Sequence, residues 1–194
     1  MIEEVTFLEK TSYEEDNTEK VLKLMKEIAD KKKIKDIIIP TTKGDVGLKA
    51  IKVFDEHYNL VIVAHQQGFK ERGTQEIPDD ILEMIRASHA KLLIAQHAFA
   101  GVARAVRKSL GTWQFPELLS QTLRTFGEGT KVSAEIALMA ADAGLIDMKN
   151  SVISSGGTGH GIDTAWILYP SHSHEIFDLR FQELICKPYL KKQS

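Results

Sequence analysis

The stretch Val152–Pro170, VISSGGTGHGIDTAWILYP, places two apolar runs on either side of a loop that holds four of the thirteen glycines of the chain. The runs at 151–154 and 165–169 have the length and composition of buried strands. Parallel neighbours in a sheet are joined by a crossover of about a dozen residues or more, usually a helix, and the glycine-rich loop is too short for one. We therefore expect the strand at 165–169 to run antiparallel.

Upstream of this stretch, strand-like and helix-like segments alternate. Continuous apolar runs predict strands that are buried on both faces, and apolar residues at helical spacing predict helices that cover them. This alternation predicts a three-layer α/β/α fold with a mostly parallel sheet of about five or more strands, the last of them antiparallel. The further expected strands are 5–8, 35–40, 60–64 and 91–95, and the clearest expected helices are 21–29, 46–54 and 130–143.

Length and composition narrow the class of protein. A chain of 194 residues with 43% hydrophobic and 27% charged residues is typical of a single soluble domain, here 1–194. A net charge of −2 gives no reason to propose nucleic acid, and no run reaches the roughly 18 apolar residues of a membrane span. The single cysteine, Cys186, excludes an internal disulfide and suits the cytoplasm. The oligomeric state stays open, a homo-oligomer included.

Four loops follow the predicted parallel strands and carry both glycine and hydrogen-bonding side chains. Because ligands bind outside the carboxyl ends of the strands in open α/β sheets, we expect these loops to meet around one small ligand. The loops are 41–45, 65–69, 96–101 and 155–163.

The first loop, TTKGD, ends a strand and opens a helix. The amides and positive dipole end of that helix could hold a phosphate, with the hydroxyls of Thr41 and Thr42 as further donors and Gly44 allowing close approach. Asp45 completes the loop. The alternative is an ordinary turn capped by threonine.

The glycine loop has the spacing Gly156-Gly157-x-Gly159-x-Gly161, which is not GxGxxG, and it leads into a strand. A dinucleotide-binding motif is therefore excluded. Consecutive glycines permit a nest of backbone donors around an anion or a polar ring, with Thr158 and Asp163 in the same loop. The alternative is a flexible hairpin connection.

Side chains beside these loops suggest further roles. No metal site is expected, so His65 and His97 are interpreted as polar contacts to an organic ligand or as proton donors. Arg104 could close over a phosphate. The long stretch 66–77, which includes Gly68, is either a lid or a mobile surface loop.

Glu135 shares a helical face with Met139 and Asp142. Two carboxylates could perform acid–base chemistry, but the spacing favours a solvated face opposite Val132 and Ile136.

Taken together, these segments resemble a family of small, largely archaeal α/β proteins that are similar to the C-terminal domain of pyruvate kinase. The resemblance covers nearly the whole chain. It rests on IIIPTTKGDVGLKA, VIVAHQQGF, AQHAFAGVARAV, AEIALMAADAGLI, SGGTGHGIDTAWILYP and ELICKP.

The resemblance implies a bound flavin mononucleotide (FMN). Its phosphate would lie at Thr41, Thr42, Gly44 and Arg104. Gly156, Gly157, Thr158 and Asp163 would lie near the ligand, and His65, Phe69, His97 and Glu135 would be candidates for the ring. Asp45, Gly68 and Gly159, from the same loops, complete the expected cofactor-binding set, and His97 and Glu135 are the catalytic candidates.

The resemblance does not imply pyruvate kinase activity. In that enzyme phosphoryl transfer takes place in a separate barrel, which a chain of this length cannot hold beside this domain, and the related domain binds an allosteric sugar phosphate. We interpret the chain as an FMN-binding protein, for which a flavin-dependent oxidoreductase is one hypothesis. The alternative hypothesis is a non-catalytic sensor or regulatory module for a phosphorylated metabolite.

Overall fold

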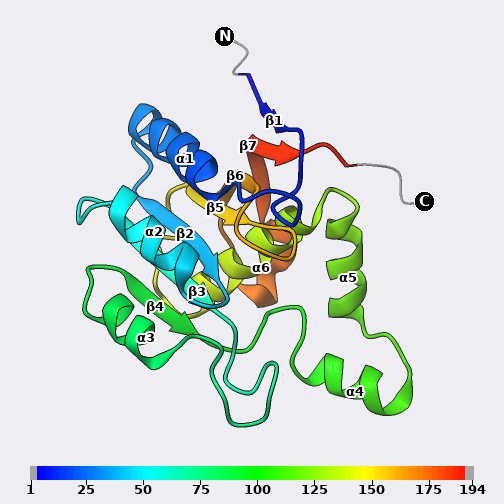
Figure 1. Cartoon of the computed structure of the whole chain (residues 1–194). Helices are drawn as coiled ribbons and strands as arrows, with labels where there is room; N and C mark the ends of the chain where they lie inside the picture. The colour runs from blue at the N-terminus through cyan, green and yellow to red at the C-terminus, as the bar shows by residue number, and fades with distance from the viewer. Residues whose placement is uncertain (1–3, 191–194) are drawn as a thin grey trace.

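The computed structural model describes residues 4–190, which form one seven-stranded sheet with helices on both faces (Figure 1). This is the three-layer α/β/α architecture predicted from the sequence. The strands are β1 (Thr6–Leu8), β2 (Asp36–Thr41), β3 (Asn59–Ala64), β4 (Lys91–Ile94), β5 (Val152–Gly156), β6 (Thr164–Tyr169) and β7 (Arg180–Pro188). The helices are α1 (Thr18–Lys32), α2 (Asp45–Val53), α3 (Asp79–Arg86), α4 (Val102–Leu110), α5 (Phe115–Arg124), α6 (Glu128–Asp142) and the 3₁₀ helix η1 (Ser173–Asp178).

The strands lie in the order β1-β7-β6-β5-β2-β3-β4. Strand β2 pairs in parallel with β3 and β5, and β3 pairs in parallel with β4. Strand β6 is antiparallel to both of its neighbours, β5 and β7, which confirms the direction predicted for 165–169. Strand β7 was not predicted. It returns to the direction of β5 and pairs in parallel with β1.

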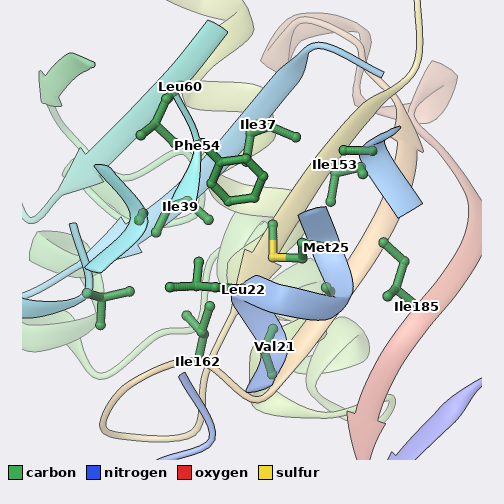
Figure 2. Close-up of a cluster of buried hydrophobic side chains, with 14 of the residues drawn as sticks. Val21, Leu22, Met25, Ile37, Ile39, Phe54, Leu60, Ile153, Ile162 and Ile185 are labelled. Atoms are coloured by element: carbon green, nitrogen blue, oxygen red, sulfur yellow. The ribbon is translucent and has the colours of Figure 1, made fainter. Parts of the chain in front are cut away.

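The apolar side chains of β2 alternate between the two faces of the sheet. Ile37 and Ile39 belong to a core with α1 and α2, whereas Ile38 belongs to a second core with α6. Figure 2 shows Met25 of α1 and Phe54, just after α2, among the labelled side chains of the first core. Because β2 is buried on both faces, a continuous run of β-branched residues is needed there.

Helix α6 covers the opposite face of the sheet. Twelve of its residues are buried, from Gly129 to Ala141, and it packs against β2, β3, β5 and β6. Helix α5 lies beside α6, and α4 contacts α5 at the margin of the molecule (Figure 1). None of the helices within residues 4–190 combines the length and apolar character of a membrane span.

Candidate functional site

A cavity of about 470 Å³ lies at the carboxyl ends of β2, β3 and β5. Residues from the loops after β2, β3, β4 and β5 line it, together with residues of α4, α5 and α6. In the sheet, the chain moves outward from β2 to β3 and β4 and then returns to the other side of β2 as β5. The cavity therefore lies at the switch point where open α/β sheets hold their ligands.

Most of the residues predicted for the site line this cavity. They are Thr41, Thr42, Asp45, His65, Phe69, His97, Arg104, Glu135, Gly157 and Gly159. The loops 41–45 and 157–161, far apart in the sequence, thus both contribute residues to the cavity wall.

The clearest chemical feature of the wall is a buried ion pair within α6. Glu135 is 2% and Lys131 is 8% exposed, and the Lys131 ammonium donates to Oε2 of Glu135. The other carboxylate oxygen accepts the backbone N–H of Phe99 at 3.1 Å. The expected solvated face for Glu135 is therefore wrong, since this carboxylate points into the protein, as does Met139 on the same face.

His97 joins this pair from the loop after β4. Its Nδ1 lies 3.2 Å from Oε2 of Glu135. Burial alone would raise the pKa of Glu135, but the hydrogen bond with His97 and the charge of Lys131 lower it to about 2. Burial lowers the pKa of Lys131, and the attraction of Glu135 opposes that shift. Because the carboxylate is an acceptor, Nδ1 carries the proton in neutral His97 and Nε2 carries the lone pair.

Three rings and a guanidinium form a cluster of mutual contacts beside the ion pair, with angles of 30°, 51° and 28° between the ring planes. The ring centroid of Phe69 lies 4.0 Å from that of His65 and 5.1 Å from that of His97, and the Arg104 guanidinium lies 4.9 Å from the Phe69 centroid. Nε2 of His97 is buried and has no hydrogen-bond partner among residues 4–190. A buried ring nitrogen of this kind leaves a hydrogen bond for a ligand or water to make.

His65 is held by the long loop that follows it. Its Nδ1 lies 2.6 Å from Glu76, and burial lowers the pKa of His65 below its ordinary value although Glu76 opposes the shift. Gly68 lies within this loop at φ +73° and donates its amide to Thr74. It shapes the turn and does not line the cavity.

Four cationic side chains reach the cavity wall. Lys131 is paired with Glu135, and Arg124 is paired with Glu128 at 2.8 Å. Within the described part of the chain no ion pair involves Lys43 or Arg104, so their charges are available to an anionic ligand. Lys43, Arg124 and Lys131 were not predicted as site residues from the sequence. The only local signal for the last two was an acidic residue four positions later.

The loop after β2 combines a cap with a close packing contact. The Thr41 hydroxyl oxygen accepts the amides of Gly44 at 3.0 Å and Gly47 at 3.4 Å, so it caps α2. Gly44 lies at φ +90°, and a Cβ there would lie 2.3 Å from Cγ2 of Ile81. Gly44 is thus required by its backbone and by the packing of α3, and it is not on the cavity wall.

The glycine loop is compact because its own backbone folds back. A Cβ on Gly157 would lie 2.0 Å from the carbonyl oxygen of Gly161, and one on Gly156 would lie 2.1 Å from that of Gly129. The loop is the connection of the β5–β6 hairpin, as the alternative interpretation had it, and its bare backbone serves close packing. Gly156 packs against α6, away from the cavity wall.

The other two predicted loop residues bind the amino-terminal segment. The Ser12 amide donates to the carboxylate of Asp163 at 2.8 Å, and the Thr158 amide donates to the Ser12 hydroxyl at 2.8 Å. Asp163 is completely buried and also accepts the hydroxyl of Thr164. Asp163 and Thr158 hold the loop in place and do not line the cavity.

A second hollow, of about 950 Å³, lies at the amino edge of the sheet. Lys35, Asn59 and Lys91 line it, along with the carboxyl ends of α1 and α6. Helix carboxyl ends carry negative dipole charge, and this hollow contains no imidazole or buried ion pair. The cavity at the carboxyl edge is therefore the better candidate site. Among the described residues, no three His, Cys, Asp or Glu side chains lie close enough to hold a metal ion.

A scan against models of known protein families returns no family that matches the chain.

Proposed function

We propose that the chain binds FMN in the cavity at the carboxyl edge of the sheet. The observation that carries the proposal is the pairing, in one cavity, of an aromatic cluster at Phe69 and His97 with the cations of Lys43 and Arg104, which have no ion pair among residues 4–190. FMN has the same two parts, a planar ring system and a phosphate. Stacking on rings and charge-assisted hydrogen bonds to phosphate are the interactions that these side chains offer.

The residues present fit this group. The cavity volume of about 470 Å³ lies in the usual range for cofactor pockets, roughly 300–1,000 Å³. The phosphate would be held by Lys43, Arg104 and the amides of Asp45 and Val46. The neighbouring amides of Gly44 and Gly47 already donate to the Thr41 hydroxyl. The ring would lie against Phe69 and His97, where Nε2 of His97 lacks a partner.

When bound, a flavin supplies electron-transfer and hydride-transfer chemistry, and the protein supplies orientation and proton handling. Here the Glu135 carboxylate holds the Nδ1 proton of His97, so Nε2 can accept a proton from a substrate or return one. Lys131 keeps Glu135 ionised during this exchange. His97 and Glu135 thus remain the proposed catalytic pair. The buried thiol of Cys186, whose pKa burial raises to about 12, suits a reducing cytoplasm.

The test compares FMN with riboflavin, which has the same ring system without the phosphate. Titration into the purified protein, followed by quenching of flavin fluorescence, should give saturable FMN binding and at least about tenfold weaker riboflavin binding, since a charge-assisted phosphate contact contributes about 1.5–3 kcal/mol. Equal affinities would exclude the phosphate contacts, and no binding of either ligand would exclude the proposal.

A second candidate function is a sensor of a phosphorylated metabolite. The specific observation is that Phe69 already stacks on His65 at 4.0 Å, so a ligand that uses only the cationic end need not displace a ring contact. Thermal unfolding with a panel of sugar phosphates and FMN separates the two. Stabilisation by a sugar phosphate and none by FMN would favour the sensor.

A further inference from the structure

Two imidazole–carboxylate pairs lie next to each other on the cavity wall. Nδ1 of His97 lies 3.2 Å from Oε2 of Glu135, and Nδ1 of His65 lies 2.6 Å from Oε2 of Glu76. A carboxylate beside Nδ1 fixes the proton of a neutral imidazole on that nitrogen, so in each ring Nε2 is the atom that takes up a further proton. The proposed chemistry uses the first pair and leaves the second without a role.

The two imidazoles are too close to become charged independently. Their ring centroids lie 5.2 Å apart, and the ring of Phe69 contacts both, at 4.0 Å from His65 and 5.1 Å from His97. The side chains of His65 and His97 are only 26% and 13% exposed, so water screens one ring from the other incompletely. The repulsion between two unit charges at this distance corresponds to about two pH units at an effective dielectric constant of about 20.

We propose that His65 and His97 hold one proton between them near neutral pH, so that His65 stays neutral while His97 is charged. Burial lowers the pKa of His65, and the charge of His97 lowers it further. The attraction of Glu76 and Glu135 opposes these shifts. The two rings, which we call the imidazole pair, therefore bind a second proton only in more acidic solution.

The cations around the imidazole pair also favour a single proton. The Lys131 ammonium donates to the carboxylate of Glu135, which is thus balanced before His97 is charged. The Arg104 guanidinium lies 4.9 Å from the Phe69 ring centroid. A second imidazolium would add to these positive charges. The other ionisable side chains on the cavity wall are those of Lys43, Asp45, His160 and the ion pair of Arg124 with Glu128.

A store of one proton matches the proposed chemistry, and this part of the inference rests on the proposed function. Reduction of a double bond by hydride transfer adds one proton for each hydride. When Nε2 of His97 gives its proton to a substrate, the repulsion on His65 disappears. His65 can then take up a proton from solvent, to which it is the more exposed of the two rings. His65 is thus a positioning residue that acts through the charge of His97.

The test is an NMR titration of the histidine rings in the ligand-free protein, so failure of FMN to bind would not affect it. We expect the titration midpoint of His65 to rise by about one to two pH units in His97→Asn, because the neighbouring charge is removed. The matched control is His160→Asn. His160 lines the same cavity but makes no ring contact with His65 within residues 4–190, so this variant should leave the midpoint unchanged.

Circular dichroism checks that His97→Asn is folded. If it is not, potentiometric titration of His65→Asn decides. Between about pH 8 and about pH 6 this variant should take up as many protons as the native chain, because His65 stays neutral in that range. A deficit of about one proton in His65→Asn would overturn the inference. An unchanged His65 midpoint in His97→Asn, or an equal rise in His160→Asn, would also overturn it.

Discussion

Lys131 and Glu135, one turn apart on α6, form an ion pair that is only 8% and 2% exposed at the wall of the cavity. His97 contacts the same carboxylate from a segment 38 positions away. The ion pair therefore contributes both to the cavity wall and to the stability of the fold. Substitutions of Lys131 or Glu135 should change ligand binding and the free energy of unfolding.

Glu135→Gln should lower the free energy of unfolding by about 3–5 kcal/mol, because it leaves the Lys131 charge buried without its partner. Lys131→Met/Glu135→Gln should recover part of that loss, since both charges are then removed. Urea unfolding of the two single variants and the double variant measures the coupling. Additive effects would mean that the two side chains do not interact.

Lowering the pH should reduce the free energy of unfolding, because the Glu135 carboxylate becomes protonated. The pKa of Glu135 is lowered in the folded state to about 2 from an ordinary value of 4.5, so the unfolded chain takes up its proton first. The stability from this group is present above about pH 4.5 and is lost as the pH falls towards 2. The difference in unfolding free energy between the native chain and Glu135→Gln should shrink across that window. A constant difference would contradict the assignment.

Arg104→Ala should weaken FMN binding by about tenfold to a hundredfold if its guanidinium contacts the phosphate. Arg107→Ala is the matched control, because Arg107 lies one turn further along α4, contacts Glu117 and Trp113, and does not line the cavity. Isothermal titration with FMN measures both. Equal losses in the two variants would point to a general effect on α4.

Gly44→Ala should destabilise the fold more than Gly73→Ala. Both glycines have positive φ, at +90° and +79°, but an added Cβ meets Ile81 only at Gly44 and has open space at Gly73. We expect a loss of about 1 kcal/mol at Gly73 and about 2–4 kcal/mol at Gly44, where crowding is added to backbone strain. Thermal unfolding without ligand is the measurement. Equal losses would show that α3 moves aside at little cost.

The strands that could be predicted are those whose sequences are uniformly apolar or β-branched. Strands β2 and β3 are continuous β-branched or apolar runs because both of their faces are covered, so local composition suffices to find them. Strand β7 lies beside the short edge strand β1 and mixes charged with apolar residues, so Arg180, Glu183 and Lys187 interrupt the apolar signal that would have predicted it. The direction of β6 followed from the length of its connection alone.

The candidate site was predictable at the level of loops and not of single side chains. Parallel strands bring their carboxyl ends to one edge, so loops far apart in the sequence could be expected to meet. The burial of Glu135 depends on His97 and the Phe99 amide, which no helical periodicity reveals. Likewise, Asp163 binds the amide of Ser12 across 151 positions, so a residue with the character of a ligand contact serves the fold.

The pairing of β1 with β7 determines when one edge of the sheet can form during translation. Thr6 lies opposite Cys186, and within residues 4–190 β7 is the only strand beside β1. During translation β1 emerges 180 positions before Cys186, the residue that Thr6 pairs with. This edge of the sheet can therefore form only after β2 to β6 have been synthesised, and until then β1 lacks its partner strand.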